Sequence, residues 1–464
     1  MLRWLGIALV VLILLAAGVF VLDGRGAPAS LVIDKPDGPV GATGTLQVTA
    51  GAPGARFSSL TIALEQNGKR FPLFSLRGAE QATIGQPDPD HLRITRPIGK
   101  DAVPELRSGT ARILVSAERK SSLGLHTFTT NAFKDIQVRL EPPRIAVVST
   151  HHYLNHGGSE MVVYRVSPPD VKSGVRVGDV EYAGFPASGA GVTSDPALRV
   201  AFFALLHDQD LNTPIAAFVK DDAGNEAKAT FIDNVFEKPF KKSKIDIDDK
   251  FMGRVVPEIL EHSPELKGVS ATGDDLLPAF LKINGELRRI NADQIGALSA
   301  KTSPARGWSE PFVQLGNSKV EAAFADHRTY IYKGQEVDQQ VHLGFDLAVT
   351  AHVPVVAAND GVVLNASWLG IYGNCIVIDH GMGVQSLYGH LMSFDVKVGD
   401  TVTRGQTIGR TDTTGLAGGD HLHFTMLVGG RMVNPVEWWD AHWIADRVDR
   451  KLREAGAGIP SAGR

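Results

Sequence analysis

The sequence holds a single cysteine, Cys375, among its 464 residues. One cysteine excludes an intramolecular disulfide framework, a cysteine-rich zinc finger and an iron–sulfur site. Any metal site in this chain would therefore take its ligands from the 15 histidines and from the carboxylates.

An excess of basic charge is also missing, because 47 Lys and Arg stand against 51 Asp and Glu and give a net charge of −4. Proteins that bind nucleic acid usually carry a strongly basic face, so no nucleic-acid partner is expected. Aromatic residues make up only 7%, whereas 49 Gly and 25 Pro supply many turns. This composition is typical of a mainly β protein that is neither disordered nor a multi-span membrane protein.

Long apolar runs are absent except at the N-terminus, where Leu5 to Leu22 is unbroken. As a helix this run would measure about 27 Å, close to the hydrocarbon core of a bilayer. Arg3 precedes it, which predicts a cytoplasmic N-terminus and an exported remainder. The run is longer than a usual signal-peptide core, which favours a membrane anchor, although Ala27-Pro28-Ala29 offers a cleavage motif for the alternative of a removed signal.

Patterning predicts several domains, as expected for a chain of this length. Alternation such as Ala111-Arg112-Ile113-Leu114-Val115 indicates half-buried strands, and the pair Pro142-Pro143 separates two such regions. Helical spacing follows over 248–262 and 274–300, after a basic, proline-containing linker signal at 238–244. The predicted divisions are a membrane anchor or signal with its linker (1–29), a β-sandwich-like module (30–142), a second one (143–236), a linker and helical segment (237–308), a C-terminal β-sheet domain (309–440), and a C-terminal helix and tail (441–464).

Histidines gather in three places within the C-terminal β region. They are His342-Leu343-Gly344-Phe345-Asp346, Tyr388-Gly389-His390-Leu391 and Gly419-Asp420-His421-Leu422-His423-Phe424. Residues two apart on a strand share a face, so His421 and His423 are expected to project to the same side. By the same rule, His342 and Asp346 can share a face. Imidazoles and a carboxylate are ligands that Zn²⁺ prefers; a catalytic site uses three and leaves one position for water. Five candidate groups would leave two imidazoles for proton transfer.

Taken together, residues 311–435 resemble the LytM/lysostaphin-type zinc metallopeptidase family, the peptidoglycan endopeptidases. Besides the three histidine motifs, the resemblance rests on Tyr372-Gly373-Asn374, His380-Gly381, the stretch from Val402 to Gly409 and Asn434-Pro435. The resemblance implies that His342, Asp346 and His423 bind one Zn²⁺ per chain, and that His390 and His421 are the catalytic pair. Which of the two moves the proton and which stabilises the oxyanion stays open.

The chain departs from the family pattern at several places. Asp420, Thr425 and Asp412 stand where Pro, Glu and Gly are common, and Ala325 stands where Gly is usual. Tyr330 and Tyr332 are only loosely placed candidates for a substrate-side tyrosine. None of the departures touches the five core groups.

The resemblance implies a membrane-anchored zinc endopeptidase that hydrolyses peptide cross-links of peptidoglycan. The expected partners are peptidoglycan peptide stems and, through the N-terminal helix, the cytoplasmic membrane, with a regulatory protein partner left open. The catalytic domain would then lie in the periplasm or outside the cell, on a single-pass inner-membrane protein. The alternative is a catalytically silent domain of the same fold that activates another cell-wall hydrolase.

Two arrangements are open for the helical stretch 248–300. Its apolar faces must be buried, either on the second β module as a plain connector, which we favour, or against the cleft near His390, where they would restrict substrate entry. Three other histidines, His151, His152 and His156, lack a carboxylate pattern, and we predict a structural or solvent-facing role for them. His380 and Cys375 are also predicted to be structural.

Overall fold

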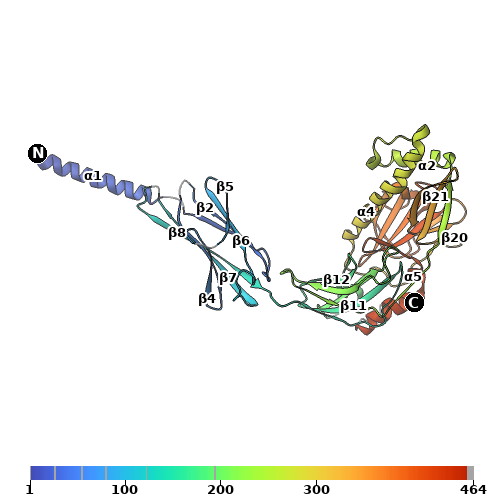
Figure 1. Cartoon of the computed structure of the whole chain (residues 1–464), viewed down its shortest axis with the longest axis horizontal. Helices are drawn as coiled ribbons and strands as arrows, with labels where there is room; N and C mark the ends of the chain where they lie inside the picture. The colour runs from blue at the N-terminus through green and yellow to red at the C-terminus, as the bar shows by residue number, and fades with distance from the viewer. Residues whose placement is uncertain are drawn as a thin grey trace. The chain divides into compact units, whose positions relative to one another are not determined.

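The computed structural model describes residues 2–25, 28–53, 56–78, 81–121, 123–192 and 195–456. It divides into two compact units, which we call the N-terminal unit (Met1–Pro143 with Lys220–Glu226) and the C-terminal unit (Arg144–Val219 with Ala227–Arg464). Figure 1 follows the chain through both units. The predicted tail beyond Gly456, the side chain of Arg3 and Ala27 of the cleavage motif lie outside the described residues.

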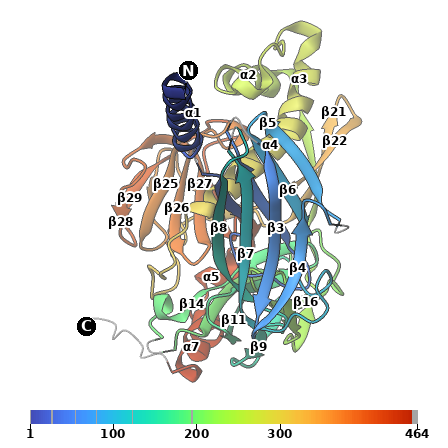
Figure 2. The same cartoon turned by 90° about the vertical axis from the view of Figure 1, so that its left-hand side faces the viewer.

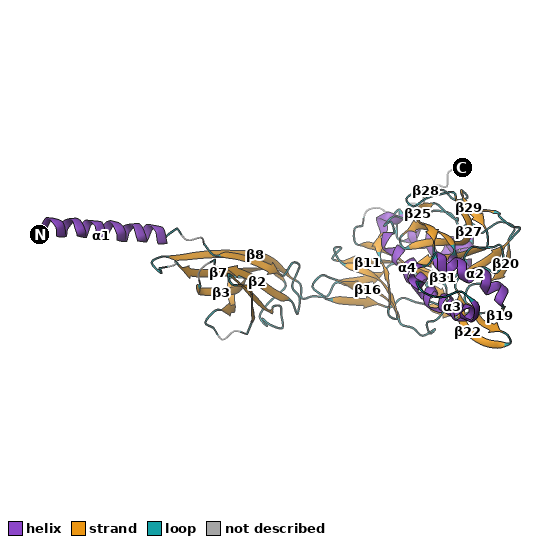
Figure 3. Ribbon diagram, turned by 90° about the horizontal axis from the view of Figure 1, so that it is seen from above, coloured by secondary structure: helices purple, strands orange, loops and turns teal. Residues whose placement is uncertain are grey.

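The N-terminal unit begins with one long helix, α1 (Leu2–Asp23), which Figure 3 shows as a single continuous ribbon. Its 22 residues span about 33 Å at 1.5 Å per residue, enough to cross a bilayer core. Among the described residues it is the one helix whose length and composition would allow this. A signal sequence has the same two properties, so the helix is compatible with both predicted alternatives.

Two four-stranded antiparallel sheets follow and form a β-sandwich. The first has the order β1 (Ser30–Lys35), β2 (Thr45–Gly51), β6 (His91–Pro97), β5 (Thr83–Asp88), and the second the order β4 (Lys69–Ser75), β3 (Phe57–Gln66), β7 (Gly109–Lys120), β8 (Thr127–Val138). Alternate residues of the facing strands, such as Val48, Ile62 and Val115, are fully buried in one core. The alternation read from the sequence places these residues between the sheets, and the predicted sandwich is confirmed.

The C-terminal unit opens with a second sandwich. Its sheets have the orders β14 (Phe185–Pro186), β15 (Leu198–Ala204), β11 (Ser159–Ser167), β9 (Arg144–Val147) and β13 (Val180–Ala183), β12 (Lys172–Val177), β16 (Ile215–Lys220), β17 (Glu226–Ala229), and β10 (Tyr153–Asn155) pairs with β18 (Asn234–Phe236). Strands β11 and β15 are buried along both faces. A sandwich strand normally has one exposed face, so a second layer must cover β11 and β15.

The segment predicted as a linker contains a strand, β19 (Lys242–Ile247). It pairs in parallel with β21 (Asp326–Tyr332), which in turn pairs with β22 (Gln335–His342). The linker prediction for 238–244 is therefore wrong over Lys242–Lys244. The lysines that suggested solvent lie on an edge strand, where lysine is common because it discourages further pairing.

Three helices follow β19: α2 (Asp249–Glu261), α3 (Leu276–Lys282) and α4 (Arg288–Leu298), with a π-helical turn at Ile283–Leu287. The predicted helical stretches are confirmed, and Asp248 caps α2 by accepting a hydrogen bond from the Phe251 amide. Figure 2 shows α2 and α3 lying next to each other.

These helices pack on the C-terminal β domain. Arg254 donates to the Ala417 carbonyl at 2.7 Å, and Asn291 accepts from the Ile371 amide at 3.0 Å. The favoured prediction, a connector packed on the second sandwich, is therefore wrong. The apolar faces of α2 to α4 pack beside the loops around Ile371 and Ala417.

The C-terminal β domain is built on a ten-stranded sheet. Its main path is β20 (Lys319–Ala322), β23 (Phe345–Ala348), β30 (Leu422–Val428), β27 (Val384–Phe394), β26 (Asn374–Gly381), β25 (Gly361–Trp368), β28 (Thr401–Val402), with β24 (Pro354–Val356), β29 (Thr407–Thr411) and β31 (Arg431–Val433) joined to it. The chain closes with α5 (Val436–Trp439), α6 (Ala441–Trp443), a π-helical stretch (Ile444–Asp449) and α7 (Arg450–Glu454).

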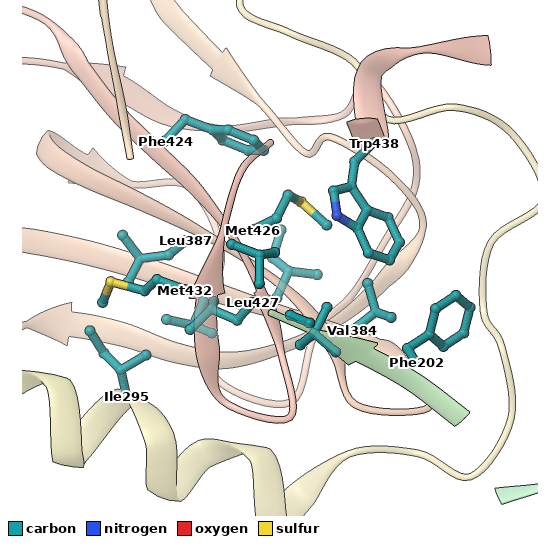
Figure 4. Packing of buried hydrophobic residues seen from close by; sticks show 14 of the residues in the cluster. Phe202, Ile295, Val384, Leu387, Phe424, Met426, Leu427, Met432 and Trp438 are labelled. Atoms are coloured by element: carbon teal, nitrogen blue, oxygen red, sulfur yellow. The ribbon is translucent and has the colours of Figure 1, made fainter. Parts of the chain in front are cut away.

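One hydrophobic core runs through the whole C-terminal unit. Phe202 of β15 contacts Trp438 of α5 with ring centroids 5.8 Å apart, and Ile295 of α4 belongs to the same buried cluster as Met426 of β30. Figure 4 shows these side chains, which come from β15, α4, β30 and α5. The core is continuous across the predicted divisions at 236/237 and 308/309.

Candidate metal centre

Strands β22, β23 and β30 bring three candidate ligands together. His342 ends β22, Asp346 lies in β23, and His423 lies in β30 directly opposite Asp346 in the antiparallel register. The chain leaves the strand at Leu343–Gly344, so His342 and Asp346 do not share one strand, as the period of two assumed. They converge because the chain turns between β22 and β23.

The imidazoles of His342 and His423 both approach one carboxylate oxygen of Asp346. Asp346 Oδ1 lies 3.3 Å from His342 Nε2 and 3.1 Å from His423 Nδ1. One ligand atom from each of the three residues lies within 4.8 Å of the others. A Cβ on Gly344 would stand 2.5 Å from two atoms of the His423 ring, so glycine is required there for the imidazole to reach this position.

Two further imidazoles face the same point. His421 Nε2 lies 3.3 Å from Asp346 Oδ1, and the ring centroids of His390 and His421 are 4.8 Å apart. The Nδ1 atom of His390 lies 2.7 Å from the Thr414 carbonyl, and that of His421 lies 2.7 Å from the Gly419 carbonyl. Because a carbonyl can only accept, both Nδ1 atoms carry a proton. His390 as a neutral ring then keeps a lone pair on Nε2, whereas Nε2 of His421 faces the Asp346 carboxylate, which can only accept.

The backbone at His390 is strained in a way that serves this arrangement. Its φ is 60°, in the left-handed region that non-glycine residues rarely adopt. The amide of Asp412 donates to the His390 carbonyl at 2.9 Å, and the Asp412 carbonyl accepts from the His421 amide at 3.2 Å. Asp412, one of the departures from the family pattern, thus spaces the two histidines with its main chain.

Burial and mutual contact set the protonation states of the group. Burial lowers the pKa values of His342 and His423, and burial together with the nearby histidines lowers that of His390. Burial opposes ionisation of Asp346, but His342 and the hydrogen bonds from the other histidines hold its pKa well below the usual range. His421 differs: burial lowers its pKa, but the hydrogen bond and charge of Asp346 together with the Gly419 carbonyl outweigh burial, so its pKa is raised. An ionised Asp346 beside neutral His342 and His423 is the state that metal ligands require.

A small pocket of about 90 Å³ opens onto these groups. Besides the five predicted site residues it is lined by Arg288, Arg328, Tyr330, Ile371, Tyr372, Leu416 and Gly418. Tyr330, a loosely placed candidate, thus faces the pocket, whereas Tyr332 bonds to Asp249 away from it. Sequence reasoning missed Arg288 and Arg328; no motif marks them.

Arg328 supports Asp346 from the side opposite the histidines. Its Nη2 atom donates to Asp346 Oδ2 at 2.9 Å, and its Nε lies 3.6 Å from Asp326 Oδ2. The Asp346 carboxylate thus gives one oxygen to the guanidinium and turns the other toward the imidazoles. Such an outer partner fixes the orientation of a metal-binding carboxylate.

The other histidines singled out in the sequence have structural partners. His152 is buried and bonds to Ser149 Oγ at 2.9 Å. His380 is buried between the Asp360 carbonyl and Ser386 Oγ, and Cys375 is fully buried in β26. A second, more exposed group of His352, Asp412 and Asp420 lies near His421 and has weaker contacts, with His352 Nδ1 3.5 Å from Asp420.

The donor set fits a metal ion. His342 Nε2 and His423 Nε2 are buried polar atoms without a hydrogen-bond partner among the described residues. Buried polar atoms are normally satisfied, so orphaned nitrogens around one carboxylate mark a site built for a ligand. Two imidazoles and one carboxylate are the chemistry of a three-ligand zinc site.

Comparison with protein families gives one match, in which the model described as peptidase family M23 covers residues 340–435. The resemblance read from the motifs is thereby confirmed. The matched residues contain all five predicted site residues, but neither Arg288 nor Arg328.

Curated relatives agree over the same part of the chain. The chain is 40% identical over 97 residues to the DD-carboxypeptidase/endopeptidase Mpg of Neisseria meningitidis and 41% identical over 96 residues to the peptidoglycan DD-endopeptidase ShyA of Vibrio cholerae. It is 38% identical over 95 residues to the murein hydrolase activator EnvC of Escherichia coli. These matches cover 21%, 21% and 20% of this chain, and 22%, 22% and 23% of the respective relatives.

Solved structures include the catalytic domain of lysostaphin from Staphylococcus simulans, 29% identical, with a TM-score of 0.24 over 26% of this chain and 92% of that chain. A zinc-containing peptidase from Vibrio cholerae is 14% identical, with a TM-score of 0.26 over 71% of this chain and 86% of that chain. Both TM-scores are below 0.5, so the family assignment rests on the sequence matches.

Proposed function

Because residues 340–435 form a domain of peptidase family M23, we propose that the protein is a zinc-dependent endopeptidase that hydrolyses peptide cross-links of peptidoglycan. One observation carries the proposal: a complete set of three metal-ligand candidates and two further imidazoles, all directed at one pocket. Relatives named as peptidoglycan DD-endopeptidases match this part of the chain and support the choice of substrate.

His342, Asp346 and His423 would hold the zinc ion. When bound, zinc supplies a Lewis acid and an activated water for hydrolysis. His390 and His421 stand beside the ligands with Nδ1 anchored on a carbonyl, which leaves Nε2 as the reacting nitrogen of each ring. A neutral imidazole takes the proton of the attacking water on Nε2 and passes it to the leaving amine, and an imidazole protonated at both nitrogens stabilises the oxyanion by donating from Nε2.

The ligand assignment predicts how metal content changes on mutation. The purified full chain in detergent is expected to hold one zinc per chain, measured by plasma mass spectrometry. His342→Ala, Asp346→Ala and His423→Ala should each lose it, because two protein ligands rarely retain zinc. His352→Ala, which alters the exposed second group, is the matched control and should keep one zinc. Stoichiometric zinc in His423→Ala would remove that residue from the ligand set.

Digestion of purified sacculi tests the reaction itself. The zinc-loaded protein should release fragments whose masses identify a broken peptide cross-link and intact glycan strands. Release of glycan fragments with intact cross-links would overturn the proposed substrate bond.

A second candidate function is favoured by the match to a relative named as a murein hydrolase activator. A silent activator would stimulate another hydrolase without cutting sacculi alone. The five convergent site residues favour an enzyme, and digestion by the isolated protein distinguishes the two.

We place the catalytic domain outside the cytoplasm, anchored in the inner membrane by α1. The support is the apolar 22-residue helix and the wall-directed names of the relatives. A reporter fused after Arg464 is expected to be active only outside the cytoplasm, and the chain should sediment with membranes after carbonate extraction. A soluble mature chain that starts at Ser30 would show instead that the helix is a cleaved signal.

A further inference from the structure

Arg288 reaches the metal pocket from outside the family domain. It is the first residue of α4, more than fifty positions before His342, yet it lines the same pocket as His342 and His390. The helical segment therefore adds a side chain to the site that residues 340–435 do not contain.

The guanidinium is held in place by its own helix. Arg288 Nε donates to the Asn284 carbonyl at 2.9 Å, and its Nη2 donates to Asn284 Oδ1 at 2.5 Å. Asn284 is fully buried and donates in turn to Asp338 Oδ2 at 2.8 Å. Both residues border or belong to the π-helical turn Ile283–Leu287, a deformation often found at functional sites.

Arg288 and Arg328 differ in how their charges are balanced. Arg328 pairs with Asp346 and Asp326. Arg288 makes no ion pair among the described residues, and its hydrogen bonds go to neutral oxygens of Asn284. A guanidinium has five N–H donors, so three of them have no partner within the described part of the chain. A fixed guanidinium without a counter-ion, beside catalytic groups, is arranged to receive an anion.

We infer that Arg288 binds a carboxylate of the substrate next to the scissile peptide bond, so that the enzyme selects peptides with a free carboxylate there. The inference rests on the proposed function and names the substrate feature that the site recognises. A carboxylate is the anion expected in a peptide, and the arginine fork matches its two oxygens.

Two synthetic cross-linked stem peptides test the inference with the zinc-loaded full chain. One carries a free carboxylate next to the scissile bond, and the other carries a carboxamide at the same place. The wild type is expected to cleave the carboxylate peptide with about 10- to 100-fold higher kcat/KM, as for a charge-assisted hydrogen-bonded pair. In Arg288→Gln this preference should fall to about twofold or less, mainly through KM, and Arg288→Lys should keep part of it.

Arg289→Gln is the matched control, since Arg289 is the exposed neighbour on the same helix and should keep the full preference. Zinc content is measured for every variant. Calorimetric binding of the carboxylate and carboxamide products to zinc-free protein gives a readout that does not depend on turnover, and it should show the same loss in Arg288→Gln.

An unchanged preference in Arg288→Gln, or equal cleavage of both peptides by the wild type, would overturn the inference and leave Arg288 a structural residue of α4. If the wild type cleaves neither peptide nor sacculi, the proposed function fails. Product binding then decides the inference alone, and equal affinities for the two products would reject it.

Discussion

Alanine at His390 or His421 is expected to leave one zinc per chain and to slow hydrolysis of sacculi by about 10²-fold or more. Neither imidazole belongs to the three-ligand set, and both are tied by Nδ1 to a carbonyl, so each offers only Nε2 to the reaction. Removing either should stop proton transfer or oxyanion stabilisation without disturbing the metal. Turnover is measured by release of soluble peptides, in parallel with metal content.

His442→Ala is the control for histidine loss, because this side chain is exposed and, among the residues that the structure describes, its ion-pair partner is Asp446 on the surface. It should retain the wild-type rate. Should His390→Ala or His421→Ala digest sacculi as fast as the wild type, that histidine is not part of the catalytic pair. Loss of zinc together with activity would place the residue among the ligands instead.

Lys451→Met is expected to destabilise the protein by about 3–5 kcal/mol, because it removes the nearest counter-charge of a buried carboxylate and leaves it only Arg447, 3.8 Å away. Lys451 Nζ lies 2.7 Å from Glu160 Oε1, and both side chains are fully buried between α7 and β11. Burial acts against both charges: it raises the pKa of Glu160 and lowers that of Lys451 to about 8. The pair persists because each charge compensates the other.

Chemical denaturation of the chain from Ser30 onward measures this effect. The double variant Lys451→Met/Glu160→Gln should recover most of the lost stability, since neutral groups of similar size remove the unpaired charge. Arg450→Met, which changes a partly exposed neighbour on α7, should cost less than about 1 kcal/mol. A Lys451→Met variant as stable as the wild type would show that the pair contributes little.

Part of the site could be predicted because its residues lie in short sequence motifs. The rest could not be predicted because its residues lie far from those motifs in the sequence. His421 and His423 are two residues apart, so strand geometry alone places them together. Asp346 was identified with its ligand partners, but its meeting with His342 depends on the turn between β22 and β23, which a period of two does not describe. Arg288 could not be found, because only the packing of α4 brings a helical residue to the pocket.

In the fold, too, elements with a local sequence pattern could be predicted, whereas contacts between distant segments could not. Alternating patterns such as that of Ala111 to Val115 revealed the strands of the first sandwich. Strand β19 was missed because its lysines have the composition of a linker, and its pairing with β21 joins residues more than eighty positions apart. The packing side of α2 to α4 was also missed, since an apolar helix face does not say which neighbour it covers.

The continuous core of the C-terminal unit bears on how such a protein can be divided and recombined. Family similarity ends at residues 340 and 435, yet Trp438, Ile295 and Phe202 pack into the same core as the matched strands. A transplant limited to the matched residues would strip this apolar surface and cut β23 away from its neighbour β20. The segment that sequence similarity marks is therefore smaller than the compact unit that shares one core, and chimeras of this protein should be joined near Arg144, not near the family boundary.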